Sequence, residues 1–202
     1  MPWYQTAERA PTSWLVIKTV VHLTVVWTIG LYLLPHLIIS WQSAMELHEL
    51  FFEPEQSLAV AVMVLASVVS LWSALLLAVK GRGTPARVDA PRHLVIDGPY
   101  AWVRNPMVVA GLAQGIAVSL YTGSALILIV LGAAALFWHL VRRRDEEHDL
   151  QRVFGRSYEL YRRSVRCWMP RRRRWAPAEP EASIAAQTLR VASSGRRRSR
   201  SR

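Results

Sequence analysis

The chain has 202 residues, of which 52% are hydrophobic, and it carries a formal net charge of +11. This combination favours a small membrane protein with basic ends over a soluble domain. A single cysteine, Cys167, excludes an internal disulfide. The charge is uneven, because the residues from Arg171 onward hold ten Arg against two Glu and so supply +8 of the +11.

Two apolar segments in the first half, residues 14–34 and 57–79, are each just over 20 residues long. Such lengths cross a hydrocarbon layer of roughly 30 Å at about 1.5 Å per residue. The first segment lacks a small-residue cleavage pattern. We therefore expect it to remain as a membrane span instead of being removed as a signal peptide.

Two shorter apolar segments, residues 107–121 and 124–141, are separated by Thr122 and Gly123. Together they are too long for one crossing, and the small polar pair lies where a turn is needed. The pattern predicts a tight helical hairpin. The fold class is then all-α, a polytopic membrane protein with about four transmembrane helices.

The loops predict the orientation. Residues 35–56 contain four Glu and no Lys or Arg, whereas residues 80–104 contain five basic residues. Positive loops stay in the cytoplasm, so both termini are expected there. Three regions follow: a two-span membrane region (1–83), a region with the hairpin and amphipathic helices (84–170), and a disordered basic tail (171–202). The tail is expected to attract anionic lipid headgroups, and nucleic-acid binding is not expected.

Residues 98–107, GPYAWVRNPM, place turn-forming, aromatic and cationic residues directly before an apolar helix. Asn105 is a favoured N-cap and Pro106 a favoured first helical residue, so the third span is predicted to begin here. The free N–H groups of its first turn would attract a carboxylate or a phosphate. An ordinary helix cap beside an interfacial aromatic belt is the alternative that these residues leave open.

A second polar cluster follows the fourth span. Only Gly132 interrupts the helix-forming residues before Gly155, so the span is predicted to continue into the cytoplasm and end near Gly155. Arg142 and Glu146 would lie one turn apart, where Glu146 pairs with Arg142 or with a cationic ligand. Apolar residues recur at helical spacing and predict amphipathic helices that fold over the mouth of the bundle. They are Leu150, Val153, Phe154, Tyr158, Tyr161 and Val165.

In the order and spacing of their motifs, residues 92–170 resemble the isoprenylcysteine carboxyl methyltransferase family of integral membrane enzymes. The resemblance is carried by LV-x-x-GPY-x-x-VRNPM, the apolar hairpin, EE-x-x-L, FG-x-x-Y-x-x-Y-x-x-x-V and a closing Pro170. That family is in turn similar to the phospholipid methyltransferases. Two positions depart from its common pattern, since Asn105 stands where His is usual and Val108 where Tyr is usual.

The resemblance implies an S-adenosyl-L-methionine site between the hairpin and the cytoplasmic helices, with a lipophilic substrate entering from the bilayer. Glu146 falls on the family's cofactor-binding glutamate and Arg142 on its substrate-facing arginine, which makes this pair the catalytic candidates. The other positions that fall at the cofactor, together with the neighbouring Arg104, are Arg92, His93, Leu94, Val95, Tyr100, Asn105, Pro106, Met107 and Val108.

The chemistry of these groups agrees with such roles. Glu146 complements a sulfonium, and Arg104 with the helix start complements the cofactor's carboxylate. Arg142 suits an anionic acceptor, and a carboxylate acceptor needs no general base. An amine acceptor would need deprotonation, for which Glu146, Glu147 or His148 are candidates.

The expected function is a membrane methyltransferase that uses S-adenosylmethionine on a prenylated, isoprenoid or other lipid-like acceptor, by carboxyl O-methylation. The alternatives are phospholipid or amine N-methylation, an NADPH-dependent enzyme related to sterol reductases, and a non-catalytic membrane scaffold. No metal site is expected, because the acidic loop around His48 lacks metal-ligand spacing.

Overall fold

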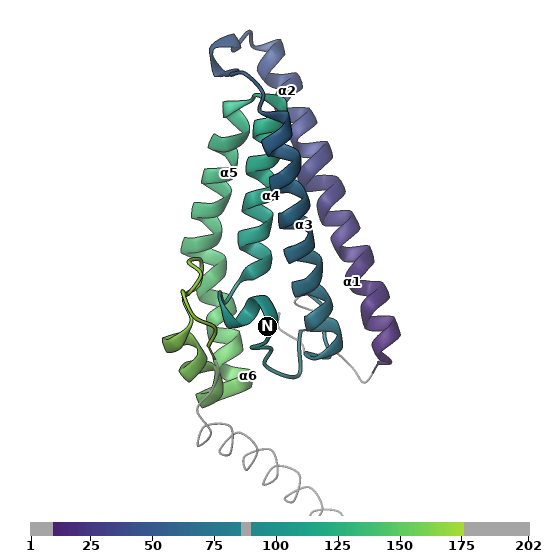
Figure 1. Cartoon of the computed structure of the whole chain (residues 1–202), viewed down its shortest axis with the longest axis vertical. Coiled ribbons are helices and arrows are strands. Elements are labelled where there is room, and N and C mark those ends of the chain that lie inside the picture. Colours follow the sequence, from purple (N-terminus) through teal and green to yellow (C-terminus); the bar gives the residue numbers. More distant parts are fainter. Residues whose placement is uncertain (1–9, 86–89, 176–202) are drawn as a thin grey trace, which may run out of the picture.

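The computed structural model of the chain describes residues 10–85 and 90–175, and their regular structure is helical (Figure 1). The helices are α1 (Thr12–Trp27), α2 (Leu34–Ala44), α3 (Gln56–Val79), α4 (Pro106–Thr122), α5 (Ala125–Phe137) and α6 (Arg143–Ser164). π-Helical segments, Thr28–Leu33 and Trp138–Arg142, join α1 to α2 and α5 to α6, and short 3₁₀ turns occupy His48–Leu50 and Gly98–Ala101. The all-α prediction is confirmed.

Three helical stretches in the described part of the chain are long and apolar enough to cross a membrane: Thr12–Ala44, Gln56–Val79 and Ala125–Ser164. α4 is apolar but has only 17 residues. The chain is therefore a multi-pass membrane protein. The sequence predicted about four spans, and three of them reach spanning length.

The first helix is longer than predicted, because it continues through Pro35 to Ala44. A proline inside a helix lacks an N–H group and its ring crowds the preceding turn. Here the π-helical segment Thr28–Leu33 precedes the proline, and the N–H of Leu34 bonds to the carbonyl of Ile29, five residues back. The widened turn accommodates Pro35 without ending the helix.

The predicted hairpin between α4 and α5 is confirmed. Gly123 ends α4 with a left-handed φ of 68°, and a Cβ there would lie 2.3 Å from the carbonyl oxygen of Phe52. The Phe52 N–H donates to the Gly123 carbonyl at 2.8 Å. In the same turn, the buried Ser124 hydroxyl donates to Oε1 of Gln42 at 2.6 Å. These contacts fix the hairpin turn to α2 and to the loop that follows it.

α3 and α4 lie side by side in the bundle (Figure 1). Gln114 of α4 is buried and donates from Nε2 to the hydroxyl of Ser67 on α3 at 2.9 Å. Small residues allow membrane helices to approach closely, and polar side chains hydrogen-bond between them. The buried residues of α3 are accordingly small: Ala59, Ala66, Ser70, Ser73, Ala74 and Ala78.

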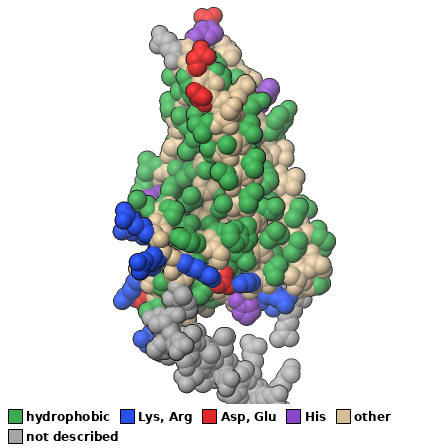
Figure 2. Space-filling model, in the orientation of Figure 1, with side chains coloured by type: hydrophobic (Ala, Val, Ile, Leu, Met, Phe, Trp, Pro, Cys, Tyr) green, Lys and Arg blue, Asp and Glu red, His purple; other side chains and the backbone are tan. Residues whose placement is uncertain are grey.

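The outer surface divides along the long axis of the bundle. Figure 2 shows hydrophobic side chains over the middle, Lys and Arg near the end where α6 lies, and acidic side chains at the opposite end. We call the end that holds α6 and the C-terminus of α3 the basic end. An apolar belt between two polar ends is typical of a protein surrounded by lipid.

At the basic end, α6 bends at Gly155, where φ is 54° and ψ is −128°. The prediction that the helix stops near Gly155 is confirmed. The part after the bend folds back and buries Tyr158, Tyr161 and Val165. The apolar residues packed against these three are Leu94, Ile96, Leu150, Phe154 and Trp175. The predicted amphipathic pieces thus pack over the loop that precedes α4.

Candidate functional site

A cavity of about 300 Å³ lies at the basic end, between α3, the loop before α4, the start of α4, and the α5–α6 helix. This volume is within the range of small-molecule sites. Every residue predicted for the site lines this cavity except Arg92. The backbone N–H of Arg92 instead donates to the carbonyl of Gly81 at 2.7 Å. Residues separated by up to 53 positions in the predicted set therefore meet around one space.

Further lining residues come from places that the sequence did not indicate. Leu77 of α3 and the buried Thr84 line the cavity, although the first half of the chain carries no motif. Trp138 also lines it, four residues before Arg142 and eight before Glu146. This spacing places Trp138 on the same helix face as Arg142 and Glu146, so the sequence could have indicated that Trp138 lines the site. Leu77 and Thr84 reach the cavity only because α3 packs against α4.

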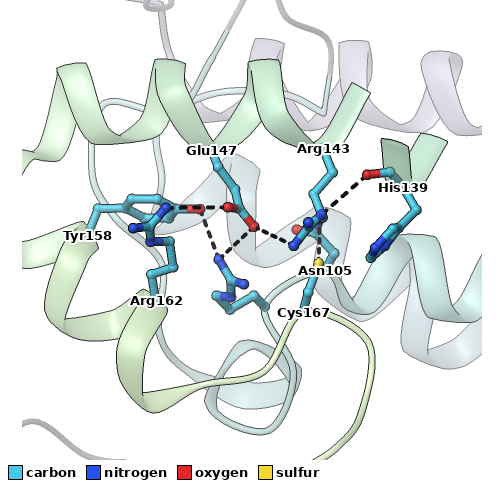
Figure 3. Close-up of polar contacts among 8 residues, drawn as sticks. Asn105, His139, Arg143, Glu147, Tyr158, Arg162 and Cys167 are labelled. Atoms are coloured by element: carbon cyan, nitrogen blue, oxygen red, sulfur yellow. Dashed lines mark hydrogen bonds and ion pairs between the residues drawn. The ribbon is translucent and has the colours of Figure 1, made fainter. Parts of the chain in front are cut away.

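α4 begins at Pro106, as predicted, but Asn105 does not cap it with its side chain. The Asn105 amide instead points toward Cys167, with Nδ2 3.9 Å from Sγ, and its backbone N–H donates to the Cys167 carbonyl at 3.3 Å (Figure 3). Burial raises the pKa of the Cys167 thiol, so it stays protonated. The segment around Cys167 therefore takes the Asn105 side chain in place of the helix end.

Glu147 is the centre of an ionic cluster beside the cavity (Figure 3). Its Oε1 lies 3.0 Å from Nη1 of Arg104 and 3.4 Å from Nη1 of Arg143, and its Oε2 lies 3.6 Å from Nη1 of Arg162. The side chains of Glu147 and Arg104 are only 17% and 10% exposed. Three guanidinium groups occupy the lone pairs of this one carboxylate. This arrangement argues against Glu147 as a general base.

Arg104 lines the cavity and retains one unused hydrogen-bond donor. Nη1 donates to the Tyr158 hydroxyl at 3.3 Å as well as facing Glu147. Nε of Arg104 is buried and has no hydrogen-bond partner among the described residues. A buried donor without a partner costs free energy. The guanidinium of Arg104 as a whole lines the cavity, where it fits a carboxylate or phosphate group of a ligand.

Tyr100 joins three elements at the back of the cavity. Its hydroxyl donates to the Ser73 carbonyl of α3 at 3.4 Å, and its own carbonyl accepts from the Tyr161 hydroxyl at 2.7 Å. Burial, together with the nearby Tyr161 and Glu146, raises the pKa of Tyr100 well above its ordinary value. Tyr100 is therefore a protonated, positioning part of the wall and cannot accept a proton at neutral pH.

The lining combines two kinds of surface. Among the described residues that face the cavity, Glu146 supplies the carboxylate, and Arg104 and Arg142 supply the guanidinium groups. Most of the remaining wall is apolar or aromatic, including Leu77, Val95, Met107, Val108 and Leu150. Such a cavity suits a ligand that carries both positive and negative groups on a largely apolar body. In the described chain no group of three His, Cys, Asp or Glu could hold a metal ion.

A profile of the phospholipid methyltransferase family matches residues 55–157, just over half of the chain. The match extends from the start of α3 past the bend at Gly155 and includes every lining residue except Tyr158 and Tyr161. No curated protein and no solved structure matches the chain. The family assignment favours the methyltransferase over the reductase and scaffold alternatives. The chain belongs to the phospholipid methyltransferase family and is a multi-pass membrane enzyme that uses S-adenosylmethionine for methyl transfer.

Proposed function

We propose that the chain methylates the carboxylate of a lipophilic acceptor, prenylated or isoprenoid, and that the cavity at the basic end is its active site. The observation that carries this proposal is the charge pattern of the described lining, in which the Glu146 carboxylate faces the same space as Arg104 and Arg142. A zwitterionic cofactor and an anionic acceptor together require both signs of charge.

Within this proposal, Glu146 attracts the sulfonium and ammonium of S-adenosylmethionine, and the guanidinium of Arg104 donates to its carboxylate. The start of α4 contributes the positive end of its helix dipole. When bound, the cofactor supplies an electrophilic methyl group. The remaining predicted positions, His93, Leu94, Val95, Tyr100, Asn105, Pro106, Met107 and Val108, form the walls that hold it and exclude water. Val108 offers apolar contact where the related family has a phenol.

Arg142 is the residue that we propose binds the methyl acceptor. It lines the cavity, is exposed, and follows Trp138 at the junction of α5 and α6. A guanidinium binds a carboxylate through two parallel hydrogen bonds. Ionised carboxylate oxygens are already nucleophilic, so positioning and water exclusion would supply most of the rate. This agrees with a lining in which Tyr100 stays protonated, and with the pairing of the neighbouring Glu147 with three arginines.

The acceptor's apolar chain would lie in the bilayer beside α5. Exposed apolar side chains, Leu136, Phe137, Leu140 and Val141, flank Trp138 and Arg142 on this helix. We further propose that α4, packed against α3, completes a fourth crossing despite its 17 residues. The basic end, and with it both termini, would face the cytoplasm, in agreement with the distribution of Lys and Arg.

A second candidate function is N-methylation of an amine headgroup, such as that of a phospholipid. The observation that favours it is the exposed imidazole of His93 in the cavity lining. A neutral imidazole is a suitable base for an ammonium acceptor near neutral pH.

Cofactor binding tests the assignment of the site. The full chain in lipid nanodiscs should bind S-adenosylmethionine in calorimetry, and Glu146→Gln should weaken binding at least tenfold, about 1.4 kcal/mol. Glu159→Gln is the matched control, because Glu159 pairs with Arg163 on the same helix and lies outside the cavity. Equal affinities of Glu146→Gln and wild type would contradict the site.

Product chemistry separates the two acceptors. Wild-type protein is incubated with methyl-labelled S-adenosylmethionine and either a lipophilic carboxylic acid or phosphatidylethanolamine. A methyl ester releases its label in alkali, whereas an N-methyl group does not. The carboxylate proposal requires alkali-labile product that is lost in Arg142→Gln. Alkali-stable product that is lost in His93→Gln would establish the amine alternative.

A further inference from the structure

An apolar groove of about 730 Å³ lies beside the loop that precedes α4. Its walls include Val69 and Trp72 of α3, Trp102 and Val103 of the loop, and Val109 of α4, and Arg174 lies at its edge. Among the described residues that line the groove, Arg174 is the one with a charged side chain. This composition is that of a site for a hydrocarbon chain with an anionic end.

The groove is separate from the cofactor cavity. Tyr100, Arg104 and Asn105 line the cavity, whereas Trp102 and Val103 line the groove, and these residues alternate along one short loop. Pro106 contributes to both spaces. The loop is thus a partition with the cavity on one side and the groove on the other. Arg142, which we propose binds the methyl acceptor, lines the cavity and not the groove.

The groove extends from the basic end toward the middle of the bundle. Trp72 and Val69 lie seven and ten residues before the end of α3 at Val79, which corresponds to about 10 and 15 Å at the rise of an α-helix. Trp72 and Trp102 are 52% and 41% exposed. Tryptophan is enriched where hydrocarbon meets lipid headgroups. The groove therefore covers the depth of a headgroup and the first part of its acyl chain.

Backbone pairing brings Arg174 to the aqueous end of the groove. The Arg171 N–H donates to the carbonyl of Trp102 at 3.0 Å, and the Trp175 N–H donates to the carbonyl of Ala101 at 3.1 Å. Arg174 lies 3.5 Å from Asp97, which is also 2.5 Å from Nζ of Lys80. Two cations share this carboxylate, so a net positive charge remains at the groove's end.

We propose that the groove binds an anionic phospholipid, with one acyl chain along Trp72 and Trp102 and the phosphate against Arg174. Burial of the acyl chain against the apolar wall favours binding, and so does the attraction between the phosphate and Arg174. This site is additional to the proposed active site and does not depend on which acceptor is methylated.

Native mass spectrometry of the full, delipidated chain tests the proposal, with phosphatidylglycerol and phosphatidylcholine as probes. Phosphatidylglycerol should bind several-fold more tightly. Arg174→Gln should weaken its binding about fivefold, from about 1 kcal/mol per basic residue near anionic lipid. Arg173→Gln is the matched control, because it removes the same charge from the adjacent exposed position outside the groove. Its effect should stay below twofold.

Trp102→Ala should weaken phosphatidylglycerol binding by a similar factor, and Trp102→Phe serves if the alanine variant does not fold. Equal losses in Arg173→Gln and Arg174→Gln would show diffuse attraction to the basic tail and overturn the site. Equal affinity for phosphatidylcholine, displacement of the lipid by a lipophilic carboxylic acid, or a lipid-excluding dimer would also overturn it. Calorimetry of S-adenosylmethionine on the same samples shows separately whether the proposed active site is intact.

Discussion

Nη1 of Arg104 lies 3.0 Å from Oε1 of Glu147, and this contact joins the loop before α4 to the first turns of α6. Arg162, beyond the bend at Gly155, reaches the other oxygen of the same carboxylate. Glu147 thereby connects the partition loop and both parts of α6. Arg104, which also lines the cavity, is thereby held in place.

Glu147→Gln should lower the free energy of unfolding by about 3 kcal/mol, because it leaves three guanidinium groups close together without their shared carboxylate. Thermal unfolding of the purified protein in detergent measures the loss. The control is Glu159→Gln, which removes a half-buried i,i+4 partner of the exposed Arg163 and should cost below about 1 kcal/mol. If both variants unfold alike, the cluster is not a stabilising element.

Gly155→Ala should destabilise the fold at the bend of α6 by about 1–3 kcal/mol. A φ of 54° with ψ of −128° is a conformation that residues with a Cβ rarely adopt. No neighbouring atom lies within 4 Å of the added Cβ, so the cost comes from the backbone alone. Gly132→Ala, inside α5 and equally free of contacts, should be neutral or slightly stabilising in the same unfolding assay.

Alkaline pH should weaken the fold through Tyr100. Its folded-state pKa is raised above the ordinary value of 10.0, mainly by burial, so the folded protein favours the protonated phenol. Stability is therefore unaffected below pH of about 10 and falls above it, because the unfolded chain ionises first. In unfolding measurements from about pH 8 to about pH 11, Tyr100→Phe should show a smaller fall than wild type. The control is Tyr121→Phe, a change at an exposed position, whose stability should fall with pH as that of the wild type does.

The hydrogen bond between Gln114 and Ser67 should stabilise the contact of α3 with α4 modestly. Gln114→Leu and Ser67→Ala should each cost about 0.6–1.7 kcal/mol, the range for such bonds between membrane helices. The double variant should cost clearly less than the sum of the two, since each change removes the same bond. Additive costs would show that the 2.9 Å contact does not contribute.

Much of the local structure follows from the sequence. The hairpin turn at Thr122 and Gly123, the start of α4 at Pro106 and the bend at Gly155 were all predicted, because turn propensity and helix termination are properties of neighbouring residues. The end of the first helix was predicted wrongly. The apolar segment was ended at residue 34, whereas a π-helical turn accommodates Pro35 and the helix continues to Ala44. The proposed roles of Arg142 and Glu146 came from spacing and resemblance and remain predictions. Most of the basic tail, residues 176–202, lies outside the described residues.

The sequence by itself determined the class of the protein and the positions of its apolar helices, because hydrophobic length and capping patterns are written in consecutive residues. The polar residues expected at the site were indicated by the family resemblance. Only the tertiary structure decided which partners those polar residues take. It directed Asn105 to Cys167 instead of its own helix, joined Arg104 to Glu147, and placed Arg92 outside the cavity. Such pairings depend on how segments tens of residues apart pack together, and local patterns carry no information about that packing.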